Sequence, residues 1–177
     1  MAKVAVVFHS GYGHTERVAQ FVAEGADADL VAIDADGNLT DAQWATLDAA
    51  DAIIMGSPTY MGMASWQFKK FADATSKKWF VSGWKDKLAG GFTCSSNLSG
   101  DKLSTLQYFM TLSMQHGMIW VGQPAMNDGT INRLGSNSGL MAQVGPNSPA
   151  ADIPQGDLDT AKAYGQRVAQ LAAKLRA

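Results

Sequence analysis

The sequence feature that most restricts the fold is a short polar loop, Ser10-Gly11-Tyr12-Gly13-His14-Thr15, between two apolar segments of different periodicity. Before it, residues 4–8 (VAVVF) form an unbroken apolar run, which predicts a strand buried on both faces. After it, Val18, Phe21 and Val22 have the i, i+3, i+4 spacing of a buried helix face. A strand that enters a helix through glycine and hydroxyl residues leaves backbone N–H groups free at the positive end of the helix dipole. This arrangement predicts a phosphate-binding loop.

Three known loop types fit this position unequally. A Walker loop needs G-x-x-x-x-G-K-[ST], and no lysine follows the second glycine here. The G-x-G-x-x-G dinucleotide fingerprint is broken at Glu16, although Asp34 lies about twenty residues on, where a ribose-binding acid would stand. A mononucleotide loop, in which the Ser10 and Thr15 hydroxyls donate to a terminal phosphate, is the leading interpretation. An ordinary strand–helix turn stays open as the alternative.

Length and composition narrow the class of protein. The 177 residues predict one domain, spanning 1–177. The formal net charge of −2 gives no reason to expect a nucleic acid or a membrane as partner, and it argues against an electron carrier with a strongly acidic docking surface. A single cysteine, Cys94, excludes an internal disulfide and fits a reducing compartment. With neither a signal peptide nor a membrane-length apolar run, we expect a cytoplasmic protein.

Apolar runs alternate with helical patterns along the chain. After residues 4–8, strands are predicted at 30–33, 52–55, 88–94 and 117–121. Residues 56–59 end the strand at 52–55. Helices are predicted after the first loop, after a Thr40/Gln43 capping box, over 63–76, from a cap at Asp101, and over 157–175. This alternation predicts an α/β fold, a doubly wound five-stranded parallel sheet with helices on both faces. Residues 123–153 are rich in Gly, Asn, Ser and Pro, and we expect a functional or interface element there.

Two further loops are expected beside the first, because ligands of such sheets lie at the carboxyl ends of the strands. In residues 56–63, Pro and Gly shape the backbone, while Tyr60, Met61 and Met63 offer flat or soft apolar surface to a planar heterocycle. Residues 94–100 supply small polar groups. Ordinary strand–helix loops are the alternative for both segments.

Several segments taken together carry a resemblance to one known family. They are Met1-Ala2-Lys3-Val4 through Ser10-x-Tyr12-Gly13-His14, Pro58-Thr59 followed by Gly62, Trp79 through Ser82-Gly83 to Lys87-Leu88-Ala89, and His116-Gly117-Met118-Ile119-x-Val121. The chain resembles the flavodoxin-like FMN proteins over nearly its whole length, and most closely the WrbA family of NAD(P)H:quinone oxidoreductases. It departs from that family in a shorter passage between the second and third strands, where family members carry an insertion involved in assembly. It also has Ser96, Leu98 and Ser99 where glycines are expected, and Met61 where an aromatic is expected.

The resemblance implies a flavodoxin-like sheet of order 2-1-3-4-5, FMN as cofactor and NADH or NADPH as electron donor. It implies transfer of two electrons to a quinone-type or related small acceptor by a homodimer or homotetramer. A one-electron carrier of the flavodoxin type, a redox-responsive FMN-binding interaction protein and an FMN reductase that releases reduced flavin stay open as alternatives. No metal is expected, because no metal-ligand spacing occurs among the histidines and Cys94.

The resemblance also implies roles for individual residues. Tyr12 is expected near the nicotinamide, and Trp79 and His116 in a flavin and substrate pocket that the family completes near subunit contacts. His116 is the candidate acid–base group for the acceptor oxygen, with a helix-end residue as its alternative. The expected FMN-binding residues are Ser10, Gly11, Tyr12, Gly13, His14 and Thr15 at the phosphate, Pro58, Thr59, Tyr60, Met61 and Gly62 along the ring, Cys94, Ser95, Ser96, Asn97, Leu98 and Ser99 at its other rim, and His116.

Overall fold

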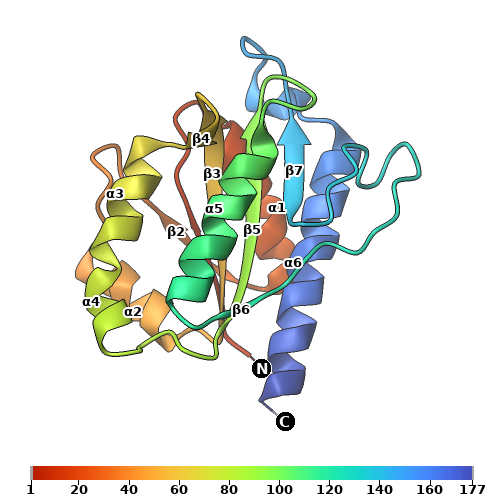
Figure 1. Cartoon of the computed structure of the whole chain (residues 1–177). Coiled ribbons are helices and arrows are strands. Elements are labelled where there is room, and N and C mark those ends of the chain that lie inside the picture. Colours follow the sequence, from red (N-terminus) through yellow and green to blue (C-terminus); the bar gives the residue numbers. More distant parts are fainter. Residues whose placement is uncertain (1, 177) are drawn as a thin grey trace.

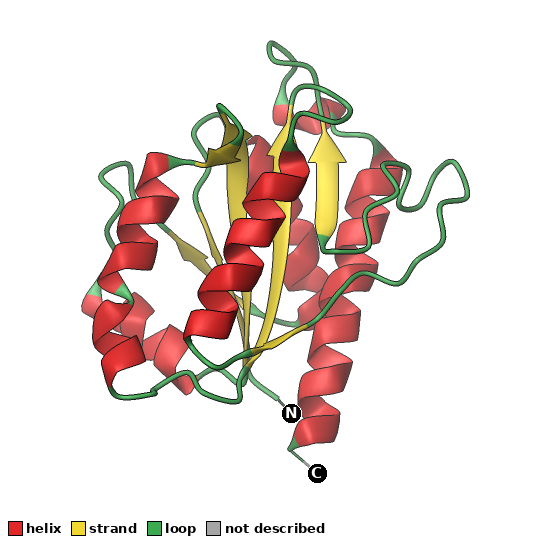
Figure 2. Cartoon of the chain, viewed as in Figure 1, coloured by secondary structure: helices red, strands yellow, loops and turns green. Residues whose placement is uncertain are grey.

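The computed structural model of the chain describes residues 2–176 and shows a parallel sheet between two layers of helices (Figures 1 and 2). The strands are β1 (Val4–Phe8), β2 (Asp29–Ala32), β3 (Ala52–Tyr60), β4 (Met63–Ala64), β5 (Leu88–Ser95), β6 (Ile119–Trp120) and β7 (Leu140–Gln143). The helices are α1 (His14–Ala26), α2 (Asp41–Ala49), α3 (Trp66–Ala74), α4 (Ser76–Phe80), α5 (Lys102–Gln115) and α6 (Gln155–Leu175), with a 3-10 turn, η1 (Ala150–Asp152). The parallel strands follow the order β2-β1-β3-β5-β6, which confirms the predicted 2-1-3-4-5 sheet.

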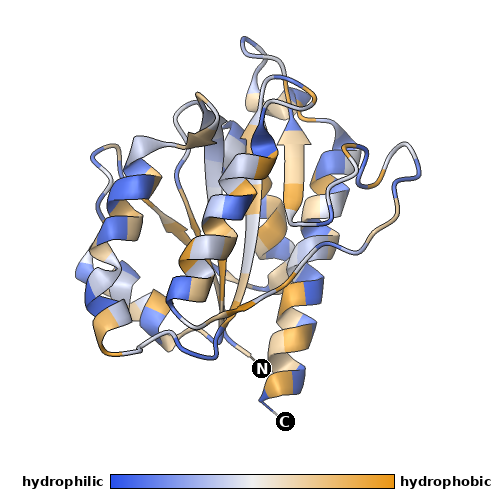
Figure 3. Cartoon of the chain, in the orientation of Figure 1, coloured by the Kyte–Doolittle hydropathy of each residue, from blue (hydrophilic) through white to orange (hydrophobic). Residues whose placement is uncertain are grey.

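The sheet separates two hydrophobic layers, because alternate residues of a strand point to opposite faces. Val4, Val6 and Phe8 of β1 belong to the layer that packs under α1 and α6, whereas Ala5 and Val7 belong to the layer under α2, α3 and α5. In Figure 3, α6 carries hydrophobic and hydrophilic residues in alternating bands, as a helix with one buried face does. The apolar run that predicts the first strand is therefore buried from both sides.

The helix starts show where local sequence chemistry decides the structure. The predicted capping box is present: Gln43 N donates to Thr40 Oγ1 at 3.3 Å, and Thr40 N donates to Gln43 Oε1 at 2.8 Å. The predicted cap at Asp101 is wrong in its chemistry. Asp101 precedes α5 with φ 51° and makes no side-chain cap, and its carbonyl oxygen accepts from Ser104 Oγ instead.

The third strand is longer than the sequence predicts, and the helix after it starts later. β3 continues through Gly56 to Tyr60, because β5 runs alongside it and pairs Pro58 with Cys94. The proline is tolerated because the β1 ladder ends at Gly56 and the β4 ladder begins at Thr59, so neither strand pairs with Pro58. The expected helix over 63–76 begins at Trp66, since Met63 and Ala64 form β4.

The far edge of the sheet consists of two short strands in place of the single strand predicted at 117–121. β6 pairs with the start of β5, where Ile119 is in register with Leu88. β7 pairs with the end of β5, where Leu140 is in register with Phe92. Residues 121–139 leave the sheet between these two strands and return to the same edge (Figure 1).

The two ends of the chain lie together at the amino ends of the strands (Figure 1). Lys3 N donates to Asp51 Oδ2 at 2.6 Å, and Arg176 Nη1 contacts the same oxygen at 3.0 Å. One carboxylate therefore joins both ends of the described chain. The loops that follow β1, β3, β5 and β7 lie at the opposite side, at the carboxyl ends of the strands.

Candidate functional site

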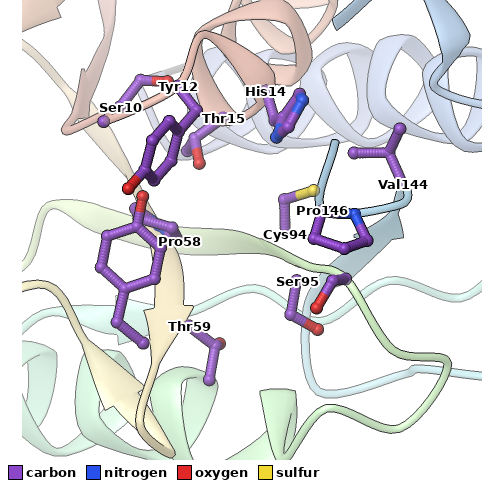
Figure 4. Close-up of a pocket in the computed structure, with 13 residues that line it drawn as sticks. Ser10, Tyr12, His14, Thr15, Pro58, Thr59, Cys94, Ser95, Val144 and Pro146 are labelled. Atoms are coloured by element: carbon purple, nitrogen blue, oxygen red, sulfur yellow. The ribbon is translucent and has the colours of Figure 1, made fainter. Parts of the chain in front are cut away.

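A cleft lies at the carboxyl ends of β1, β3 and β5. It is next to the point where the strand order reverses, with β2 on one side of β1 and β3 on the other. This is where a doubly wound sheet binds its ligand. The cleft offers about 540 Å³ of space, including its open mouth. Its walls, shown in Figure 4, are Ser10, Gly11, Tyr12, His14, Thr15, Pro58, Thr59, Tyr60, Cys94, Ser95, Ser96, Val144 and Pro146.

The first loop has the geometry of an anion cradle. Gly13 has a left-handed φ of 83° immediately before α1, and no side chain among the described residues caps the first turn of that helix. The Ser10 Oγ atom is buried and has no hydrogen-bond partner within residues 2–176. Thr15, at 1% exposure, lies in the first turn of the same helix and lines the cleft. An unpaired hydroxyl beside free helix N–H groups fits a terminal phosphate.

A fourth loop, which follows β7, completes the cleft. His14 Nε2 lies 2.7 Å from the Ser148 carbonyl oxygen, which can only accept, so this nitrogen carries the proton. The bond ties the loop after β7 to the first loop, and Val144 and Pro146 form the adjoining wall (Figure 4). The sequence predicted a functional or interface element over 123–153, but nothing in its composition pointed to Val144 and Pro146 as walls of a cleft.

The second loop presents aromatic and apolar surface at the mouth of the cleft. Met61 and Gly62 both have left-handed φ values, 47° and 82°, and form the tight turn between β3 and β4. The turn leaves the Met61 side chain fully exposed. The Tyr12 and Tyr60 rings meet edge to face, with centroids 6.3 Å apart, and Tyr12 is 78% exposed. These side chains offer the flat surface that a planar heterocycle needs.

Buried hydroxyl groups fix the second loop onto the sheet and α5. Thr59 Oγ1 lies 2.8 Å from Thr93 Oγ1 and 2.8 Å from Thr105 Oγ1. Ser104 Oγ, also on α5, donates to the Gly62 carbonyl oxygen. On the other side of the loop, Ser65 Oγ lies 2.9 Å from His9 Nδ1, and burial lowers the pKa of His9. The loop is therefore held from two sides.

The third loop is organised by a buried lysine that the sequence analysis did not single out. Lys102 opens α5, yet its residue exposure is 0%. Its Nζ donates to Ser95 Oγ at 2.8 Å, to the Asn97 carbonyl oxygen at 2.6 Å and to the Leu98 carbonyl oxygen at 3.0 Å. A lysine in the first turn of a helix opposes the helix dipole, and this mismatch is the signal that could have identified it.

Cys94 ends the buried part of β5 at the floor of the cleft. Burial raises the pKa of its thiol to about 12, so the group stays protonated at neutral pH. Its place in the cleft is therefore that of a small apolar side chain, and the site holds no thiolate nucleophile at this position.

A partly buried ion pair links the third loop to α6 and β7. Arg133 Nη2 donates to Asp157 Oδ2 at 2.9 Å, and Asp157, at 2% exposure, also accepts from Gln143 N at 3.0 Å. Gln143 Nε2 in turn donates to the Ser96 carbonyl oxygen at 2.8 Å. The ion pair thus fixes one rim of the cleft through Gln143.

The structure does not bring Trp79 and His116 to this cleft. His116 follows the C-terminal end of α5, whereas the third loop precedes its start, and a helix of this length spans roughly 21 Å. His116 Nε2 donates to Thr75 Oγ1 at 2.8 Å, because that hydroxyl donates to the Ala72 carbonyl oxygen. Burial lowers the pKa of His116. Trp79, half exposed, lies on a second, shallower depression with His116.

The remaining expected residues stay near the cleft without forming its walls. Gly13, Met61, Gly62, Asn97, Leu98 and Ser99 belong to the three loops but not to the lining. Within residues 2–176, no group of three or more His, Cys, Asp or Glu residues could hold a metal ion. In the same part of the chain, no helix is both long and apolar enough to cross a membrane.

Comparison with known proteins gives consistent results. The profile of the family described as NADPH-dependent FMN reductase matches residues 5–132. Flavodoxin FldP from Pseudomonas aeruginosa (strain UCBPP-PA14) is 51% identical over the full length of both chains. The crystal structure of a WrbA-like flavodoxin from Agrobacterium tumefaciens is 53% identical, with a TM-score of 0.84 over 98% of this chain and 99% of that one. A flavodoxin from the domain Archaea, 19% identical with a TM-score of 0.66 over 97% and 99% of the two chains, shares the fold.

Proposed function

The chain belongs to the NADPH-dependent FMN reductase family and has the flavodoxin-like fold, and from this premise we propose that it moves two electrons from NADH or NADPH to a quinone-type or related small acceptor. FMN, held in the cleft at the carboxyl ends of the strands, supplies the redox chemistry when bound. The chain supplies the phosphate cradle, the ring walls and a mouth where donor and acceptor bind in turn. The acceptor is a small molecule, and we place the reaction in the cytoplasm.

The observation that carries this proposal is the buried, unpartnered Ser10 hydroxyl beside the uncapped start of α1. A buried hydroxyl without a partner costs stability, so its retention is best explained by a ligand that pairs with it. The loop contains no lysine, and the N–H groups, Ser10 and Thr15 are suited to a terminal phosphate monoester. FMN ends in such a group.

The other walls fit the rest of the flavin. Thr59 and Tyr60 on one side and Ser95 and Ser96 on the other leave a slot open to solvent at Tyr12. An exposed aromatic ring at the mouth gives a nicotinamide or a quinone a surface on which to stack. Because donor and acceptor would share this one face, reduction and reoxidation occur in sequence.

The expected roles of Trp79 and His116 require a second copy of the chain. Both lie at the other end of α5, so neither reaches the flavin of its own chain. Their neighbours Phe80 and Met114 are 82% and 55% exposed, which leaves apolar surface there for a subunit contact. We therefore keep a homodimer or homotetramer in the proposal, with His116 as a candidate acid–base group.

Anaerobic titration of the FMN-loaded protein with NADPH and then NADH tests the proposal. We expect either nucleotide to bleach the flavin directly to its two-electron-reduced form, and benzoquinone to restore the oxidised spectrum. The preferred electron donor is the nucleotide that reduces the flavin faster. The proposal fails if neither nucleotide reduces the flavin while dithionite does.

A one-electron carrier is the second candidate, since two relatives with more than half of their residues identical are called flavodoxins. In the same titration, a carrier would accumulate a stable one-electron-reduced flavin with dithionite and stay oxidised with nucleotides. The small net charge of −2 gives a carrier little acidic surface for docking, and it favours the enzyme.

A further inference from the structure

Lys102 has an unusual environment for a lysine at the start of a helix. The residue is fully buried, and its three N–H donors are all used, on Ser95 Oγ and on the carbonyl oxygens of Asn97 and Leu98. Every one of these acceptors belongs to the third loop. All hydrogen bonds of the lysine therefore go to the third loop, and the residue is not accessible to solvent.

All three acceptors are neutral, so the charge of the ammonium group is not cancelled. Within residues 2–176, no carboxylate lies at ion-pairing distance from Lys102. Asp157, the carboxylate that acts on it, is engaged by Arg133, and these two opposite charges offset each other at a distance. Burial lowers the pKa of Lys102, which reflects the cost of keeping a cation there. A buried charge that no protein group neutralises favours an anion nearby.

The cleft is the nearest place where such an anion can bind. Lys102 Nζ is 2.8 Å from the hydroxyl of Ser95, and Ser95 and its neighbour Ser96 form a wall of the cleft. The ammonium is therefore hydrogen-bonded to a residue that lines the space assigned to the flavin ring. In a site of low dielectric, a charge at this range acts strongly on charge that develops in the ring.

We propose that Lys102 is a positioning residue that fixes the third loop and makes the cleft bind the reduced, anionic flavin more tightly than the oxidised, neutral ring. This inference rests on the proposed binding of FMN. The phosphate charge is the same in both oxidation states, so a difference between their affinities isolates the effect on the ring.

The test replaces Lys102→Met, which keeps the length of the side chain and removes its charge. For each protein we would measure the dissociation constant of oxidised FMN and the two-electron potential of bound FMN by dye equilibration. We expect the affinity for reduced FMN to fall about tenfold more than that for oxidised FMN, which lowers the potential by about 30 mV. Lys102→Arg retains the charge and should keep the wild-type ratio of affinities.

Lys87→Met is the matched control. Lys87 Nζ also donates to three backbone carbonyl oxygens, of Leu47, Asp48 and Ala50, at 3.1, 2.5 and 2.7 Å, but it lies at the amino ends of the strands. Its loss should leave the ratio unchanged even if the protein melts at a lower temperature. If Lys102→Met does not fold, Lys102→Gln takes its place.

The outcomes separate the two proposals. A wild-type protein that does not bind FMN refutes the proposed function. FMN binding with equal ratios in wild type and Lys102→Met refutes the role of Lys102. The role is also refuted if Lys87→Met shifts the ratio equally, or if Lys102→Arg shifts it as far as the uncharged variant.

Discussion

The two ends of the sheet treat their charged and polar groups in different ways. At the amino ends of the strands, Asp51 accepts hydrogen bonds from Lys3 N and Arg176 at the surface. Lys87 there donates to carbonyl oxygens at the end of α2. At the carboxyl ends, the charges are buried and shape loops, while the Ser10 hydroxyl is left without a partner in the described chain. The charged groups at the two chain ends are therefore paired within the chain, whereas we propose that FMN completes the hydrogen bonding at the carboxyl ends of the strands.

The largest expected difference between the ends concerns their carboxylates. Asp157→Asn would leave the partly buried Arg133 without its counter-charge, and we expect a loss of about 3 kcal/mol in the free energy of unfolding. This corresponds to a fall in Tm of roughly 10 °C. The matched change Asp51→Asn, at a partly exposed group that also accepts from a backbone N–H and an arginine, should cost at most about 1 kcal/mol. Similar Tm shifts in the two variants would contradict the contrast between the ends.

The next effect concerns the group left open for a ligand. Ser10→Ala removes a hydrogen bond to a charged phosphate, and we expect the FMN dissociation constant to rise by about 10- to 100-fold, with little change in the Tm of the apoprotein. Ser76→Ala, at an exposed serine that starts α4, is the control and should bind FMN as the wild type does. Titration by flavin fluorescence quenching measures both. An unchanged affinity in Ser10→Ala would remove the main support for the phosphate cradle.

The smallest expected effect concerns the two buried histidines, one at each end of the sheet. Burial lowers the pKa of His9 and of His116. Below about pH 6.5 the unfolded chain therefore binds more protons than the folded one, so stability is complete above that pH and falls as the pH drops toward the folded pKa values. Each histidine contributes a slope of at most about 1.4 kcal/mol per pH unit. His9→Gln and His116→Gln should each flatten the fall in unfolding free energy between pH 7 and 5, and an unchanged slope in both would show that other groups titrate.

Much of the fold follows from patterns within single segments. The apolar run at 4–8, the Thr40 capping box and the loop from Ser10 to Thr15 contain their own physical reasons in a few adjacent residues, and the structure has the first two as predicted. The loop stands where it was expected, at the start of α1. Local chemistry was sufficient wherever the deciding contacts are local.

The features that the sequence analysis missed depend on contacts between distant segments. Pro58 lies inside β3 only because β1 ends beside it and β5 continues. Val144 and Pro146 reach the cleft because β7 pairs with the far end of β5, which no pattern in the loop reveals. Lys102 looks like a surface residue until the third loop folds over it. In each case the position of the residue depends on a distant segment of the chain that packs against it.

The position of the two chain ends has a consequence for joining this domain to others. Both ends leave from the side of the sheet opposite to the cleft, and Asp51 holds them close together (Figure 1). A second domain attached to either end would extend away from the mouth of the cleft and leave it open to small molecules. For the same reason, a short linker between the two ends, with new ends opened in the exposed stretch of residues 126–130, would give a rearranged chain with the same sheet.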